Sequence, residues 1–255
     1  MKPSAICKRC GGLKTKKAGK YLLCKPCTDA RISAWKAPKR NELRSKNLAY
    51  KARNRTKIND VEKCRRDRMR QMVLEHYGLL CSCCGENNQA FLCIDHIHGD
   101  GNKQRKDGIS GTAMMKWLID HNFPTGFRTL CHNCNFGIWA YGTCPHQGVP
   151  TKTGGPRYEY MKRLRAEIRR TVLLRYSPSM KCMCCGEDHF EFLALDHVDG
   201  GGKAHQKTAG RGSQFYKWIV ANSFPDGFQV LCHNCNFGKG SGNCCPHEMP
   251  EVQSS

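Results

Sequence analysis

The sequence lacks long apolar runs and is poor in acidic residues. No run of roughly 18 apolar residues occurs along the chain, so we expect no membrane-spanning helix. The first ten residues contain no apolar core of a signal peptide, and we therefore expect no secretion. Only 21 acidic residues stand against 42 lysines and arginines, which gives a formal net charge of +21 and an isoelectric point of about 9.4. This excess of positive charge favours a polyanion as the partner.

Cysteine, by contrast, is abundant. The 255 residues include 19 cysteines, an odd number, and many of them stand in Cys-x-x-Cys pairs. A disulfide scaffold would be secreted and usually smaller. Zinc held by thiolates in a reducing compartment is therefore the favoured interpretation, and we expect a cytoplasmic protein.

One segment of the sequence occurs twice. The octapeptide LCHNCNFG fills residues 130–137 and again 231–238, an offset of 231 − 130 = 101 that holds without a gap from Cys81 to His146. A period this long indicates a duplicated domain and not a short solenoid repeat. The predicted organisation is an N-terminal zinc knuckle (1–28), a basic helical arm (29–58), a first repeat (59–148), a linker (149–156), a second repeat (157–248) and a tail (249–255).

The N-terminal region carries two Cys-x-x-Cys pairs around a loop rich in glycine and lysine. Their members are Cys7, Cys10, Cys24 and Cys27. This spacing is typical of a small zinc ribbon or treble-clef-like knuckle, which folds only when the metal binds. The alternative is four unpaired thiols in an unstructured arm.

The arm that follows is strongly basic. Residues 31–70 hold 15 lysines and arginines against four acidic residues, a net charge of 15 − 4 = +11, which is more than a solvated helix face requires. We expect Pro38 to break this segment early, and Asn59-Asp60 to cap a helix that ends at Gly78. The predicted DNA contacts are Lys36, Lys39, Arg40, Arg44, Lys51, Arg53, Arg55, Arg65 and Arg66.

Both repeats show the same predicted order of elements. Each opens with a basic amphipathic helix, which in the second copy spans residues 158–176. Two short apolar strands follow, and between them lie a Gly-rich loop and a short helix around Trp117 or Trp218. The second strand runs into a Cys-x-x-Cys knuckle and a final helix.

Each repeat offers four thiolates at the spacing of a tetrahedral structural zinc site. The first set is Cys81, Cys84, Cys131 and Cys134, and the second is Cys182, Cys185, Cys232 and Cys235. Together with the N-terminal knuckle, these sets predict about three zinc ions per chain. All four positions of each ion are filled by protein, so these ions leave no place for a reacting water.

An Asp-His pair and an asparagine recur beside these sets. Asp95 and His96 end the first strand, and Asn135 directly follows a predicted zinc ligand. A carboxylate and an amide oxygen suit Mg²⁺, and a neutral imidazole can take a proton from water. The alternative is a surface turn and a helix-capping asparagine. The second copy repeats the three residues as Asp196, His197 and Asn236.

The ordered motifs IDHIHG…LCHNCN and LDHVDG…LCHNCN, framed by Cys-x-x-Cys pairs, resemble HNH nucleases of the ββα-metal (His-Me finger) class. They are most similar to the zinc-bearing recombination endonuclease VII type. The resemblance implies an α+β fold of small zinc-stabilised domains, with two tandem ββα-metal units behind the N-terminal knuckle and basic arm. It also implies bacterial or phage origin.

Carried over residue by residue, the resemblance gives Asp95 and Asn135 a catalytic Mg²⁺ or Mn²⁺ ion and makes His96 the general base. Asp196, Asn236 and His197 would do the same in the second copy, for up to two such ions per chain. His98 matches a further family histidine that could assist. The second copy has Asp199 there, which leaves its relative activity open.

The expected function is a metal-dependent DNA endonuclease. A monomer would act on double-stranded DNA as a single-chain pseudo-dimer, with one centre on each strand, as a site-specific or homing-type enzyme. A junction-resolving nuclease is the second hypothesis. The rival from another class is a zinc-dependent DNA-binding protein without catalytic activity.

Six further residues leave a question open. Cys83, Cys144 and His146, and their counterparts Cys184, Cys245 and His247, could join His132 or His233 in another zinc site. A packed terminal loop explains them as well. Cys64, Cys93 and Cys244 have no counterpart in the other copy and are expected to be ordinary thiols.

Overall fold

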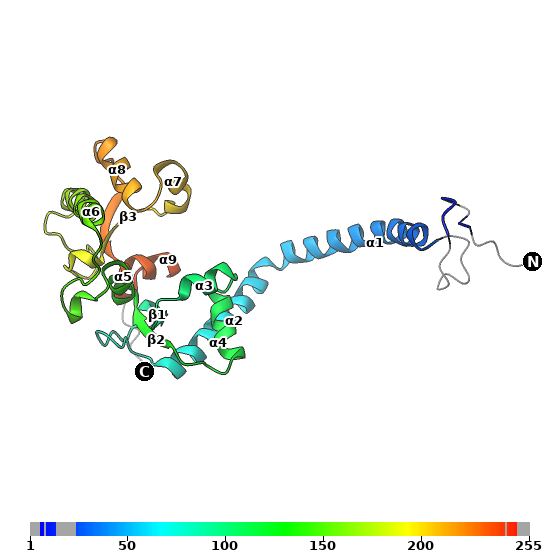
Figure 1. Ribbon diagram of the computed structural model, residues 1–255, viewed down its shortest axis with the longest axis horizontal. Helices are drawn as coiled ribbons and strands as arrows, with labels where there is room; N and C mark the ends of the chain where they lie inside the picture. The colour runs from blue at the N-terminus through cyan, green and yellow to red at the C-terminus, as the bar shows by residue number, and fades with distance from the viewer. Residues whose placement is uncertain (1–5, 8, 14–23, 243, 249–255) are drawn as a thin grey trace, which may run out of the picture. The chain divides into compact units, whose positions relative to one another are not determined.

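The computed structural model describes residues 6–7, 9–13, 24–242 and 244–248. They belong to two compact units, Met1–Asp67 and Arg68–Ser255, whose elements are labelled in Figure 1. The predicted tail and residues 14–23 of the loop between the two N-terminal cysteine pairs lie outside the described residues. The described part has an α+β fold, which combines helices with two small two-stranded sheets, as predicted.

The first unit contains a small turn and a long helix. Ile6 and Leu13 form an antiparallel bridge, and helix α1 (Lys25–Arg53) begins directly after Cys24. Pro38 lies inside α1, so the predicted break there is wrong. A proline removes one helical hydrogen bond, and good helix formers such as alanine, lysine and arginine surround this one.

Helix α2 (Arg55–Tyr77) begins after the single residue Asn54. Asn59 and Asp60 lie within α2, so the predicted cap at these residues is also wrong. The Asn54 side chain instead donates a hydrogen bond to the Tyr50 carbonyl at the end of α1. All nine predicted DNA-contact residues are exposed on these two helices.

Each repeat of the second unit pairs two antiparallel strands and then forms a helix. In the first repeat, β1 (Leu92–His96) pairs with β2 (Phe127–Cys131), and α5 (His132–Tyr141) follows at once. In the second, β3 (Leu193–His197) pairs with β4 (Phe228–Cys232), and α9 (His233–Gly242) follows. The remaining elements are α3 (Gly101–Lys106), α4 (Thr112–Asp120), α6 (Pro156–Tyr176), α7 (Gly202–Ala209), α8 (Ser213–Ala221) and the 3₁₀ turns η2 (Gln89–Phe91), η3 (Pro145–Gln147), η4 (Phe190–Phe192) and η5 (Pro246–Glu248).

This order matches the predicted one, except that part of each Gly-rich loop is helical. Helices α3 and α7 occupy segments that we expected to be irregular. The register is the same in both sheets, because His96 lies opposite Phe127 and His197 opposite Phe228. The duplicated sequence therefore gives a duplicated local structure.

The two repeats share one hydrophobic core. Helix α5 contacts η4 of the second repeat, and α9 contacts η2 of the first. A Cβ added at Gly137 would lie 3.1 Å from a Phe192 ring carbon, and one added at Gly238 would lie 2.9 Å from a Phe91 ring carbon. Glycine at these two positions allows each helix to approach the phenylalanine of the other repeat.

Candidate metal centres and active site

The structure brings the cysteines of all three predicted zinc sets together. In each set the four Sγ atoms lie within 4.8 Å of one another. The Cys84 and Cys131 sulfurs are 3.8 Å apart, as are those of Cys185 and Cys232. Tetrahedral zinc with bonds of about 2.3 Å places two sulfurs about 3.8 Å apart. The thiols present therefore fit zinc in number and spacing.

Local structure explains why these cysteines converge. The Cys81 N–H donates to the Glu86 carbonyl at 2.9 Å, which closes a tight turn around the first Cys-x-x-Cys pair. Cys131 ends β2 and caps α5, and its Sγ accepts a hydrogen bond from the Cys134 N–H at 3.4 Å. One pair thus sits on a turn and the other at a strand–helix junction. The 101-residue offset reproduces the same contacts at Cys182, Glu187, Cys232 and Cys235.

The six Cys and His residues whose role the sequence left open group with a cysteine of the four-cysteine sets, and not with His132 or His233 as we considered. Cys83, Cys144 and His146 gather around Cys134, and Cys184, Cys245 and His247 gather around Cys235. His132 instead stacks on Phe237, and His233 packs at a tilt against Phe136, with ring centroids 3.7 and 3.8 Å apart. Their Nε2 atoms are buried without a hydrogen-bond partner.

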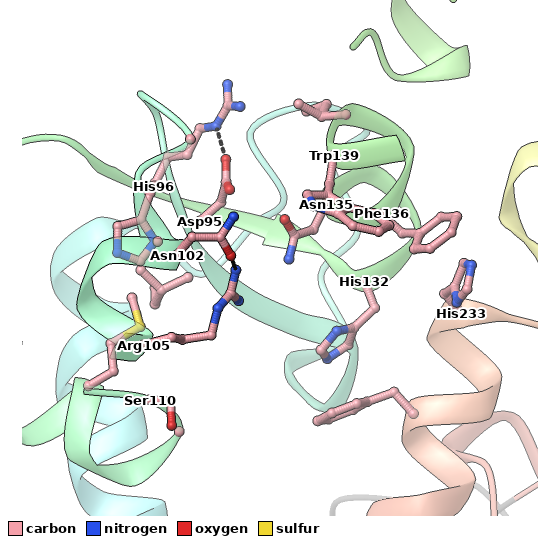
Figure 2. Close-up of a pocket in the computed structure, with 18 of the residues that line it drawn as sticks. Asp95, His96, Asn102, Arg105, Ser110, His132, Asn135, Phe136, Trp139 and His233 are labelled. Carbon is pink, nitrogen blue, oxygen red and sulfur yellow. Dashed lines mark hydrogen bonds and ion pairs between the residues drawn. The ribbon is translucent and has the colours of Figure 1, made fainter. Parts of the chain in front are cut away.

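In the first repeat, Asp95, His96 and Asn135 line one cavity. The first two end β1, and Asn135 lies in the first turn of α5. Figure 2 shows the Asn135 side chain pointing from its helix towards Asp95. Because Asn135 directly follows Cys134, a zinc-bound Cys134 would fix the position of this amide.

Cys93, which we expected to be an ordinary thiol, helps to orient Asn135. The Asn135 Nδ2 atom donates a hydrogen bond to the Cys93 Sγ at 3.2 Å, which fixes the rotation of the amide. Burial raises the pKa of the Cys93 thiol to about 12, so its sulfur stays protonated at neutral pH. The contact between Cys93 in β1 and Asn135 in α5 is visible only in the folded chain. The second repeat has Ala194 at this position.

The imidazole of His96 is held on two sides. Its Nε2 atom lies 2.9 Å from the Gln104 Oε1, and its ring centroid is 4.8 Å from that of Phe127. A Cβ added at Gly101 would lie 2.8 Å from His96 Nδ1, so only glycine leaves space for the ring in this position. His98, in contrast, is exposed and is not among the residues that line the cavity.

Asp95 is partnered by its neighbour across the sheet. The Arg128 Nε donates to Asp95 Oδ2 at 2.9 Å, and the two residues are directly opposite in the β1–β2 register. The guanidinium therefore approaches along the sheet, whereas Asn135 comes from the helix. Arg105 and Lys152 also line the cavity and make it basic.

The second repeat places Asp196, His197 and Asn236 on the equivalent elements, but Asp196 has a different partner. The Lys239 Nζ lies 2.8 Å from Asp196 Oδ2, and it also donates to the carbonyl oxygens of His197 at 2.8 Å and Val198 at 2.7 Å. Lys239 stands one turn after Asn236 in α9, so its ammonium reaches Asp196 from the helix side. The first repeat has Ile138 at this position.

The general-base candidate of the second repeat also differs. The His197 Nε2 atom lies 2.8 Å from the His205 Nδ1, where the first repeat has Gln104. Burial and the neighbouring His205 lower the pKa of His197. Asp196, His197 and Asn236 line a second cavity, and Asn236 also lines the first. The two cavities therefore adjoin at α9.

No protein-family model, curated protein or solved structure matches this chain. Within the described residues, no helix combines the length and apolar character needed to cross a bilayer. The chemistry of the site therefore rests on the residues themselves.

Proposed function

We propose that this chain is a metal-dependent DNA endonuclease and that its first repeat is the reacting centre. The observation that carries the proposal is the convergence of Asp95, His96 and Asn135 in one basic cavity beside a candidate zinc site. These are the three residues that the resemblance to HNH nucleases singles out. The side-chain oxygens of Asp95 and Asn135 are hard ligands that fit Mg²⁺ or Mn²⁺.

Each residue has a role that its position supports. Asp95 and Asn135 would hold the divalent ion, which when bound would draw charge from the scissile phosphate. With the Gln104 amide oxygen as acceptor, the proton of His96 sits on Nε2 and Nδ1 is the basic nitrogen. That nitrogen would take a proton from the attacking water. Arg105 and Arg128 would contact the phosphate.

Charge supports a polyanionic substrate, because the chain has a net charge of +21 and nine exposed cationic candidates along α1 and α2. The resemblance to HNH nucleases makes double-stranded DNA the polyanion that we propose. Phosphate contacts would supply much of the affinity and make it depend on salt. Specificity would come from base edges or DNA shape. A site-specific or homing-type enzyme remains the first hypothesis, and a junction-resolving enzyme the second.

The second repeat carries a specific difference that changes the expected product. The Lys239 ammonium is held by one carboxylate and two carbonyl oxygens, and Lys239 lies on the same helix as Asn236. A built-in cation at this place competes with a divalent ion for Asp196. We therefore expect the second centre to react more slowly than the first, so that nicking of one strand precedes the two-strand cut.

Supercoiled plasmid incubated with and without Mg²⁺ tests these assignments. Wild-type protein is expected to give open circles only with the metal. His96→Ala should lose roughly 10²–10⁴-fold in rate, the usual effect of removing a general base. Cys64→Ser, which alters an exposed thiol outside the candidate site, is the matched control and should cut normally.

Two further variants separate the alternatives. Lys239→Ile gives the second repeat the residue of the first and should increase the share of linear product. If wild-type protein binds plasmid but cuts it with neither Mg²⁺ nor Mn²⁺, the chain is the non-catalytic binder. If linear product forms first and His96→Ala and His197→Ala each convert it to open circles, both centres react. Linear and four-way-junction DNA, compared at equal concentration, distinguish the two enzyme hypotheses.

A further inference from the structure

Two candidate metal sites in each repeat share one thiol. The Cys134 Sγ lies within 4.8 Å of the sulfurs of Cys81, Cys84 and Cys131, and the same limit holds for a second group, Cys83, Cys144 and His146. The second repeat shows the same arrangement around Cys235. The four-cysteine set therefore accounts for only part of the ligands gathered at this place.

The distances in the second group match a metal site. His146 Nδ1 lies 3.3 Å from the Cys134 Sγ and 3.5 Å from the Cys144 Sγ. The corresponding distances from His247 Nδ1 are 3.4 Å to Cys235 and 3.5 Å to Cys245. A zinc ion with tetrahedral bonds to sulfur and nitrogen would set this separation at about 3.6 Å. The geometry thus occurs twice.

We propose that each repeat binds two zinc ions bridged by a single thiolate. The Cys134 sulfur bridges in the first repeat and the Cys235 sulfur in the second. The first ion takes Cys81, Cys84 and Cys131 as its other ligands, and the second takes Cys83, Cys144 and His146. This proposal concerns the scaffold and does not depend on nuclease activity.

Charge favours the bridged pair. One zinc ion with four thiolates carries 2 − 4 = −2. A second ion adds +2, and the thiolates of Cys83 and Cys144 add −2, while a neutral His146 adds nothing. The cluster therefore keeps the same net charge but spreads it over two metals. This matters because Cys134 and Cys144 are fully buried, where excess charge is costly.

The second ion would also tie the repeats together. Cys144 and His146 lie at η3, which follows α5, and the His146 ring is 5.1 Å from the ring of Phe192 in the other repeat. His247 lies 4.9 Å from Phe91 in the same way. Fixing η3 and η5 to the zinc clusters would therefore hold each of them against the opposite repeat.

The test begins with the full chain purified under reducing conditions. Zinc analysis should give five ions per chain, one from the N-terminal set and two from each repeat. X-ray absorption at the zinc edge should show metal–metal scattering, and substitution with ¹¹³Cd should give resonances coupled through the shared sulfur. A count of three zinc ions overturns the proposal. Five ions without metal–metal scattering or Cd–Cd coupling overturn the bridge.

Variants locate the extra ion. Cys83→Ser combined with His146→Ala should lower the count to four and roughly halve the metal–metal signal, because only one cluster remains paired. Cys64→Ser is the matched control and should keep five, since Cys64 is exposed and outside these groups. If the double variant retains five ions, Cys83 and His146 hold no metal and the assignment is overturned.

Discussion

Asn133 and Asn234 hold each other across the junction of the two repeats. Each backbone N–H donates a 2.9 Å hydrogen bond to the side-chain oxygen of the other residue, and both residues are buried. They occupy equivalent places, 234 − 133 = 101 residues apart, in the first turns of α5 and α9. The junction therefore has local two-fold pseudo-symmetry, which a duplicated sequence can form with itself.

Asn133→Ala should destabilise the second unit, because it leaves the Asn234 N–H buried without an acceptor. The expected cost is about 1–3 kcal/mol. Asn133→Ala combined with Asn234→Ala should cost a different amount from the sum of the single variants, since the two bonds form one network. Urea unfolding measures these changes. Asn87→Ala, on an exposed residue, is the control. If the single and double variants lowered the free energy of unfolding no more than Asn87→Ala does, the Asn133–Asn234 pair would contribute nothing to stability.

Gly101→Ala should impair catalysis more than stability. The new Cβ would meet His96 Nδ1 at 2.8 Å and push the ring away from Gln104. Under the proposed function, plasmid cleavage should fall towards the level of His96→Ala, while zinc content is retained. Gly155→Ala, where a Cβ meets nothing within 4 Å, should cut like the wild type. Unchanged cleavage by Gly101→Ala would contradict the role given to His96.

Neutralising part of the arm should weaken DNA binding and flatten its salt dependence. Replacing Lys36, Lys39, Arg40 and Arg44 with glutamine removes four exposed charges from α1. If all four contact phosphates, the slope of log K against log salt should fall by up to about 3.6, at about 0.9 per contact. Fluorescence anisotropy at several salt concentrations measures it. A matched set of four glutamines at uncharged exposed positions of α1 is the control, and an unchanged slope would exclude the arm from the interface.

The stability of the second unit should fall as the pH drops below about 6.5. Burial, together with nearby arginines, lowers the pKa of His132 to about 4 and that of His233 to about 3. Near pH 6.5, these two histidines therefore bind protons in the unfolded chain but not in the folded chain. The contribution of the two neutral histidines to stability is therefore fully present above about pH 6.5. It declines towards pH 4, where His132 also protonates in the folded state.

Replacing both histidines with phenylalanine tests this pH dependence. Phenylalanine can keep the ring contacts with Phe237 and Phe136 but does not titrate. Denaturant unfolding of the double variant should vary less with pH than that of the wild type. Zinc content is followed in parallel, because thiolates also take up protons in acid. Equal pH profiles at equal zinc content would rule out the two histidines as the cause.

Many residues of the candidate site could be predicted from the sequence, because they belong to short local motifs. The two cysteines of a Cys-x-x-Cys pair lie in a single turn and can bind the same metal ion. A repeated sequence predicts that the structure of the first copy forms a second time. For this reason the sequence indicated the three cysteine sets, whose sulfurs converge, and also Asp95, His96 and Asn135, which line one cavity. Net charge is a property of composition and needs no fold at all.

Other local signals were overridden. Pro38 and Asn59 are common helix breakers or caps, yet both lie within helices. Their propensities are worth about a kcal/mol to a few kcal/mol each, and long flanking runs of helix-forming residues can outweigh them. The helical parts of the Gly-rich loops were missed for a related reason, since their glycines were interpreted as markers of irregular structure.

The sequence by itself determined which residues can bind metal and that the chain is made of two copies of one unit. Only the tertiary structure decided which contacts the differing residues make and where the copies meet. Lys239 reaches Asp196 across 43 residues, Asn135 reaches Cys93 across 42, and Asn133 meets Asn234 across 101. Such contacts depend on the packing of segments far apart in the chain, and no local spacing encodes them.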